Sequence, residues 1–143
     1  GRLEIVSNNP FIILDGAHNL AAARNLAKFL STNLAGKAIT LVIGILDDKP
    51  YKGMLKSLLT PATRVILTRA KTDRALEPGK LYEVAKSLTP DVTIIPDVGQ
   101  AIKKAVETTP HHGAICIAGS LYVVGEAKEA FEKGLIGRCG PSK

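Results

Sequence analysis

Short apolar runs alternate along this chain with longer stretches of helical periodicity. Five runs are continuous and rich in β-branched residues: Phe11 to Leu14, Ala38 to Leu46, Val65 to Thr68, Val92 to Ile95 and Ala114 to Ala118. Continuous runs of this length are typical of strands buried on both faces of a parallel sheet. A sixth run, Leu3 to Val6, precedes an Asn-Asn-Pro turn and predicts a short edge strand.

Each buried run is followed by a stretch with the spacing of an amphipathic helix. In the first, one helix face would carry Leu20, Ala23, Ala27, Leu30 and Leu34. The second begins at Pro50 and stops before Pro61, and the third runs from about Pro78 to Leu88.

The last two helices are predicted from their first residues. Asp97 and Gln100 have the spacing of a capping box and start the fourth. Ser120 is a favoured N-cap residue and starts the fifth, whose inward positions are expected to be Leu121, Val124 and Phe131.

Strands that alternate with helices predict an α/β fold. We expect a Rossmann-like, open and mostly parallel sheet of about six strands, with helices on both faces and right-handed crossovers. This domain would occupy residues 1–133, and residues 134–143, with three glycines and a proline, would form a loose tail. The pattern leaves the order of the strands open.

Length and composition narrow the possible functions. The chain has 143 residues, 45% of them hydrophobic, which suffices for one self-contained core and leaves no room for a second domain. Its net charge of +6 favours anionic ligands, but the basic residues are scattered and aromatics make up only 4%, which argues against a nucleic-acid surface. The sequence has no apolar stretch of about 20 residues and no leader pattern, so we expect a soluble cytoplasmic protein.

Polar residues follow the carboxyl ends of the predicted strands, where ligands bind in such sheets. They are Asp15 to Asn19 after the first buried strand, Asp47 to Lys49 after the second, Arg69 to Arg74 after the third, and Gly119 and Ser120 after the fifth. The sequence contains neither a GxxxxGK[ST] nor a GxGxxG phosphate loop, and no Cys/His spacing of a zinc site. If this domain contacts ATP, it completes a site built elsewhere.

Several of these segments, in the same order, carry a resemblance to a known family. Gly1 to Glu4 and Leu14 to Asn19 resemble the GR-x-E and LDGAHN signatures of folylpolyglutamate synthases and dihydrofolate synthases, members of the Mur ligase superfamily. The blocks Val42 to Lys49, Thr68 to Ala75 and Gly119 to Glu126 add further matches. The sequence departs from the family pattern at Leu20, Pro50 and Asp73.

The resemblance implies an incomplete enzyme. Family members carry an N-terminal domain with a P-loop and the Mg²⁺ ligands, followed by a Rossmann-like domain of this size. Because the chain begins near that domain junction, we expect an excised C-terminal domain, inactive alone, of an ATP-dependent ligase. The reaction activates the terminal carboxylate of dihydropteroate or tetrahydrofolate as an acyl phosphate, which the amino group of L-glutamate then attacks.

The resemblance also implies residue roles, each with a structural alternative. Arg2 would reach the ATP phosphates or remain an exposed terminal arginine. Asp15 would contact the nucleotide, or only cap the following helix or fix its own turn. His18 would orient glutamate or the acyl phosphate, or only cap a helix. Arg74 would clamp the glutamate carboxylate or remain a solvated loop residue. Ser120 would cap its helix and contact the same carboxylate.

Two other classes of function remain open from the residues alone. One is a non-catalytic Rossmann-like module that binds a ligand or regulates a partner. The other is a basic protein-interaction domain. The ligase hypothesis predicts that Arg2, His18 and Ser120 converge on an open surface, whereas the interaction domain predicts no such convergence.

Overall fold

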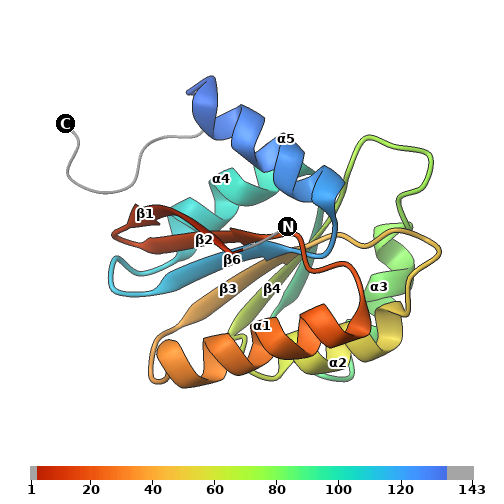
Figure 1. The fold of residues 1–143 in the computed structure, drawn as a ribbon, viewed down its shortest axis with the longest axis horizontal. Helices are drawn as coiled ribbons and strands as arrows, with labels where there is room; N and C mark the ends of the chain where they lie inside the picture. Colours follow the sequence, from red (N-terminus) through yellow and green to blue (C-terminus); the bar gives the residue numbers. More distant parts are fainter. Residues whose placement is uncertain (1–2, 135–143) are drawn as a thin grey trace.

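The alternating strands and helices fold into a single mixed sheet with helices on both sides (Figure 1). The computed structural model describes residues 3–134. Its strands are β1 Glu4–Asn8, β2 Phe11–Asp15, β3 Ile39–Ile43, β4 Arg64–Arg69, β5 Val92–Asp97 and β6 Ala114–Ala118. Its helices are α1 Leu20–Asn33, α2 Tyr51–Leu59, α3 Pro78–Ala85, α4 Val98–Thr108 and α5 Leu121–Glu132. The predicted α/β class is therefore confirmed.

Strand order was the part of the architecture that the sequence left open. The order is β1-β2-β6-β3-β4-β5, with β1 antiparallel to β2 and every other neighbouring pair parallel. The last strand, β6, therefore lies between β2 and β3. Because α5 after β6 packs on the opposite face from α1 and α2, which follow β2 and β3, β6 marks the topological switch of the sheet.

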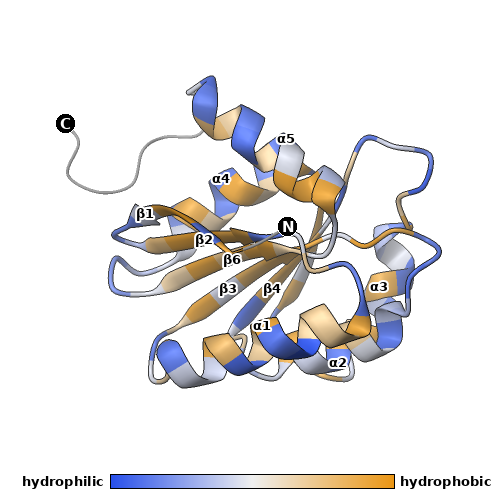
Figure 2. Cartoon of the chain, viewed as in Figure 1, coloured by the Kyte–Doolittle hydropathy of each residue, from blue (hydrophilic) through white to orange (hydrophobic). Residues whose placement is uncertain are grey.

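The core consists of two apolar layers, one on each face of the sheet. Leu41 and Ile43 of β3 pack in the layer under α1, α2 and α3, whereas Val42 between them packs in the layer under α4 and α5. This alternation follows from the two-residue period of a strand. Figure 2 shows the apolar strands between helices whose outer faces are polar. Cys116 is fully buried here, and burial raises the pKa of its thiol, as expected for a core cysteine.

Two boundaries and one burial prediction were wrong. β5 was expected to be buried, but it is the edge strand of the sheet and Ile94 is 39% exposed. The pattern Val-Thr-Ile-Ile does not distinguish an edge strand from a central one, although Pro96 inside the strand is typical of an edge. β3 ends at Ile43 and not at Leu46, and α3 ends at Ala85 and not at Leu88.

The inward face of α5 also differs from the prediction. The prediction was wrong for Leu121, which is 52% exposed, whereas Val124 and Phe131 are partly buried and pack against the core. The buried residues of α5 are Val123, Ala127 and Ala130. The predicted loose tail, apart from Gly134, lies outside the described residues.

β3 and β6 approach each other closely where both leave the sheet. The Gly44 amide donates to the Ala118 carbonyl at 3.3 Å, and Gly119 has a φ of +109°. A Cβ on Gly119 would lie 2.3 Å from the Gly44 carbonyl oxygen and 2.8 Å from Ile43 Cγ1. Only glycine satisfies both the backbone angle and the space at this crossing.

Gly119→Ala is expected to destabilise the domain by about 3 kcal/mol, because it combines left-handed strain with a backbone clash. Urea unfolding followed by circular dichroism measures this change. Gly125→Ala in α5 is the matched control, since no atom lies within 4 Å of the added methyl group. It should stabilise the helix by up to about 1 kcal/mol. Equal stability of the two variants would contradict the assigned constraint.

Candidate functional site

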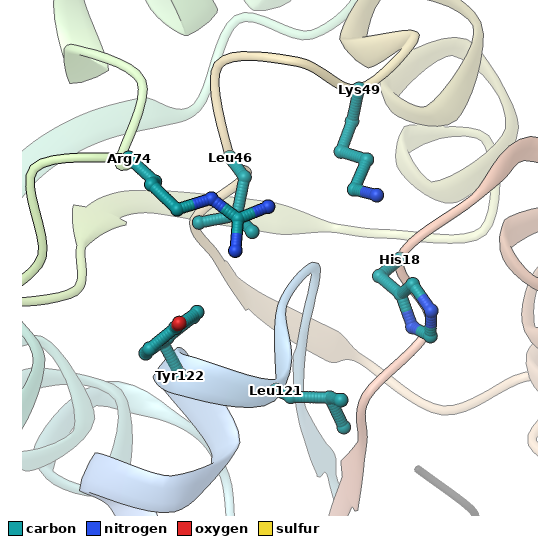
Figure 3. Close-up of a pocket in the computed structure, with 6 residues that line it drawn as sticks. All are labelled: His18, Leu46, Lys49, Arg74, Leu121 and Tyr122. Carbon is teal, nitrogen blue, oxygen red and sulfur yellow. The ribbon is translucent and has the colours of Figure 1, made fainter.

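A pocket of about 380 Å³ lies at the carboxyl edge of the sheet, beside the topological switch. Its wall is formed by His18, Leu46, Lys49, Arg74, Leu121 and Tyr122. These residues come from the segments that follow β2, β3, β4 and β6. Figure 3 shows the Arg74 and Lys49 side chains extending into one open space, with His18 and Leu121 along its other side.

His18 is positioned by the tight turn between β2 and α1. Its Nδ1 lies 2.8 Å from the Gly16 carbonyl oxygen. Because a carbonyl only accepts, Nδ1 carries the proton in this contact. Nε2 has no hydrogen-bond partner within residues 3–134, so it can accept a hydrogen bond or, in the charged ring, donate one. Asn19 then caps α1, accepting from the Ala22 amide at 2.8 Å, as predicted. The contact with Gly16 thus orients the imidazole without using Nε2.

Arg74 reaches the pocket from the loop after β4. Its backbone carbonyl accepts from the Asp47 amide at 2.7 Å, which fastens this loop to the one after β3. The guanidinium lies 3.5 Å from the Asp48 carboxylate and 6.0 Å from the centre of the Tyr122 ring. Both contacts favour a cation at this position, and the exposed pair with Asp48 leaves donors available to a ligand.

Ser120 supports the pocket from behind its wall. The residue is buried, and its Oγ accepts from the Tyr122 and Val123 amides at 3.0 and 3.2 Å. The predicted N-cap is therefore confirmed. This cap directs the first turn of α5 toward the pocket, where Leu121 and Tyr122 form the wall.

Three pocket residues were not assigned from the sequence: Leu46, Leu121 and Tyr122. Lys49 was noted after its strand but was given no role. The stripe Val123-Ala127-Ala130 has helical spacing of four and three residues, and it excludes Leu121 and Tyr122 from the buried face. That spacing was the available signal for an apolar, solvent-facing start of α5.

The pocket is electropositive. His18, Lys49 and Arg74 contribute basic groups, and Lys49 has no ion pair within residues 3–134. α1 begins just after His18 and α2 just after Lys49, while α5 begins in the wall itself. Helix N-termini add a positive potential, although Asn19 and Ser120 already accept from first-turn amides of α1 and α5. The arrangement suits one or more carboxylate or phosphate groups.

Asp15 lies at the end of β2 and fixes the turn that carries His18. Its Oδ1 accepts from the Ala17 amide at 2.9 Å, which matches the turn-fixing alternative. Burial raises the pKa of this carboxyl group, and the hydrogen bond from Ala17 opposes that rise. Arg2, the other predicted ATP contact, lies outside the described residues.

Other ligand classes find less support in the described part of the chain. Residues 3–134 contain no group of three or more His, Cys, Asp or Glu side chains placed to hold a metal ion. No helix within these residues combines the length and apolar composition needed to cross a membrane.

A family profile described as the C-terminal domain of dihydrofolate synthetase matches residues 2–129. This match covers most of the chain, including the segments around the pocket. The chain belongs to this family.

Individual relatives agree with the family assignment. The dihydrofolate synthase/folylpolyglutamate synthase of Bacillus subtilis is 31% identical over 129 residues, which are 90% of this chain and 30% of that protein. The structure of E. coli FolC in complex with DHPP and ADP has 26% identity and a TM-score of 0.86, covering 93% of this chain and 31% of that one. A bifunctional folylpolyglutamate synthase/dihydrofolate synthase with Mn, AMPPNP and L-glutamate bound has 28% identity and a TM-score of 0.84, covering 92% and 31%.

These proteins are about three times as long as the matched region. The chain spans only 30% of the Bacillus subtilis relative and 32% of the dihydrofolate synthetase of Saccharomyces cerevisiae. The family assignment therefore concerns one domain of a larger type of protein.

Asp15→Asn is expected to stabilise the domain at neutral pH. Because burial raises the folded-state pKa of Asp15, the folded protein binds this proton more tightly than the unfolded chain. Wild-type stability therefore falls as pH rises from the unfolded pKa through the raised folded pKa. An amide keeps the acceptor for Ala17 and removes the buried charge, so the advantage of the variant should vanish at low pH.

Thermal unfolding from pH 3 to pH 8 measures this effect. Asp73→Asn, at an exposed loop position, is the control and should leave the difference between acid and neutral pH unchanged. A variant at position 15 that is less stable than wild type at neutral pH would contradict the burial argument.

Proposed function

We propose that this chain is the glutamate-binding domain of an ATP-dependent ligase that joins L-glutamate to a folate. The observation that carries the proposal is the convergence of His18, Lys49 and Arg74 on one open pocket at the switch point of the sheet. Family membership supplies the chemistry: the relatives named above are synthases, and one was solved with L-glutamate and AMPPNP bound. The folate acceptor would be dihydropteroate or a tetrahydrofolate.

The charge pattern fits an amino-acid dicarboxylate. Glutamate carries two carboxylates, and the pocket offers a forked guanidinium, an ammonium group and an imidazole. A guanidinium can donate two parallel hydrogen bonds to a carboxylate, which gives orientation as well as affinity. We assign Arg74 to this carboxylate contact, with Lys49 as a second cation near it.

His18 would orient the reacting end of glutamate. The reaction forms an amide bond when the glutamate nitrogen, as a free amine, attacks the activated folate carbonyl. Phosphate leaves with the electrons of the broken carbon–oxygen bond, and the nitrogen releases one proton to solvent. With its proton on Nδ1, the imidazole can accept from the glutamate amine through Nε2, and in the charged ring Nε2 can instead donate to the acyl phosphate, in line for that attack. We assign His18 this positioning role. We assign Ser120 the cap that directs the first turn of α5 toward the glutamate carboxylate.

ATP would contact this domain only at its margin. We assign Asp15 to the nucleotide and Arg2 to its phosphates, as the family signature implies. Asp15 can both fix its turn and contact the nucleotide. One carboxylate oxygen accepts from the Ala17 amide, and the other can accept from ribose hydroxyls.

The larger part of the catalytic site would belong to a preceding P-loop domain. We propose that the P-loop domain holds the ATP phosphates and Mg²⁺, and that the metal ion neutralises phosphate charge there. Residues 1–133 would close over that domain. Because the reaction consumes ATP, we place the enzyme in the cytoplasm.

The test is ligation of glutamate to dihydropteroate and to tetrahydrofolate by the full-length protein that contains this domain. Arg74→Ala should raise the glutamate KM by about 10- to 100-fold, the cost of about 1.5–3 kcal/mol for a lost charged hydrogen bond. His18→Ala and Arg2→Ala should each reduce kcat/KM by at least about tenfold. The 143-residue chain alone should show no turnover.

Arg64→Ala is the matched arginine control. Arg64 begins β4 at the opposite edge of the sheet, where it pairs with Asp91 at 3.1 Å, so its loss changes the net charge equally without touching the pocket. Turnover by the isolated chain, or an unchanged full-length enzyme after both pocket substitutions, would refute the division of labour. A non-catalytic binding module would then be the better account.

A further inference from the structure

The loop that carries Arg74 is fastened to α5 by a carboxylate outside the pocket. Glu126 Oε2 accepts from the Lys71 backbone amide at 2.6 Å, a short, charge-assisted contact. Glu126 Oε1 is buried, finds no hydrogen-bond donor within residues 3–134, and lies 3.8 Å from the Lys71 ammonium. A buried carboxylate oxygen without a donor costs folding free energy, so its presence here needs a structural or functional explanation.

Glu126 and Tyr122 lie one turn apart on α5 and touch both ends of the same loop. Glu126 holds Lys71 at its start, and the Tyr122 ring lies 6.0 Å from the Arg74 guanidinium near its end. Residues four apart share a helix face. One face of α5 therefore contacts the loop at two points, three residues apart.

The Lys71 side chain extends this attachment to α4. Its ammonium lies 3.1 Å from Asp97 Oδ1, while Asp97 Oδ2 accepts from the Gln100 amide at 2.9 Å and caps α4. The hydrogen bond to Asp97 raises the pKa of Lys71. Because this ion pair is exposed, it adds little energy by itself. The hydrogen bond from the Lys71 amide to Glu126 therefore remains the direct tie between the start of the loop and α5.

We propose that Glu126 is a positioning residue for Arg74, acting through the Lys71 amide to set where the guanidinium lies in the pocket. The inference rests on the proposed function, in which Arg74 binds a glutamate carboxylate. Between Lys71 and Arg74 the loop closes on itself through Thr72, whose carbonyl accepts from the Ala75 amide at 3.1 Å. Because this turn is short and hydrogen-bonded, a displacement of Lys71 also displaces Arg74.

The variants separate the backbone contact from the charge. Glu126→Ala removes both, whereas Glu126→Gln keeps an amide oxygen that accepts from Lys71. In the full-length enzyme, Glu126→Ala should raise the glutamate KM about tenfold with kcat within about threefold of wild type. Glu126→Gln should restore the KM to within about threefold. Glu129→Ala, an exposed glutamate on the same helix that pairs with Lys133, should match wild type.

Non-additivity tests whether Glu126 acts through Arg74. In an Arg74→Ala background, Glu126→Ala should add less than about twofold to the glutamate KM, because the group it positions is already absent. Multiplicative effects of the two substitutions would overturn the proposal. So would a Glu126→Gln variant as impaired as Glu126→Ala. If Glu126→Ala does not fold, Glu126→Asp shortens the reach by one methylene and should still raise the KM.

Amide hydrogen exchange supplies a readout that does not depend on activity. The Lys71 amide should lose protection in Glu126→Ala and keep it in Glu126→Gln and Glu129→Ala. A wild-type enzyme that does not ligate glutamate, or an Arg74→Ala variant with a normal KM, would refute the proposed function even if the exchange pattern holds. An active enzyme with an Arg74 effect but unchanged Lys71 exchange in Glu126→Ala would refute the positioning role alone.

Discussion

The pocket depends on the close approach of two backbone segments, at Gly44 after β3 and at Gly119 after β6. Both strands leave the sheet there, and a side chain at position 119 would strike the Gly44 carbonyl. Immediately beyond the crossing, Ser120 caps α5 on one side and the chain runs from Gly44 to Lys49 on the other. The two walls of the pocket thus diverge from a single point of backbone contact. The distance between the two walls is set by the close packing of Gly44 and Gly119, which leaves no space for a rearrangement.

Around this point, the polar residues divide into two groups. Asp15, Asn19 and Ser120 use their side-chain oxygens to bind backbone amides of their own turns and helices. His18, Lys49 and Arg74 direct basic groups into the pocket. The first group gives the turns their shape, and the second remains available to a ligand. The motif DGAHN contains members of both groups: Asp15 and Asn19 fix the turn and the helix start, and His18 lines the pocket.

His18 and Lys49 present basic groups on one open edge, and Arg74 is paired there with the exposed Asp48. The arrangement is consistent with a domain that contributes only part of a site. The relatives are three times as long, and their solved structures contain nucleotide, metal or glutamate ligands. The hydrogen bonds from the Asp47 amide to the Arg74 carbonyl and from the Lys71 amide to Glu126 keep the pocket loop in place while the basic edge faces outward.

The sequence by itself determined those features that depend on residues close together in the chain. The strand and helix alternation, the caps at Asn19, Asp97 and Ser120, and the turn after β2 all rest on contacts between residues two to four positions apart. Such contacts leave a readable pattern, and the placement of candidate residues after strands followed from it. Only the tertiary structure decided that β6 inserts between β2 and β3, that β5 lies exposed at an edge, and that Leu121 and Tyr122 face the pocket. These outcomes depend on which apolar faces pack together across 50 or more residues, for example Ile39 beside Ala114, and single-chain periodicity does not encode that choice.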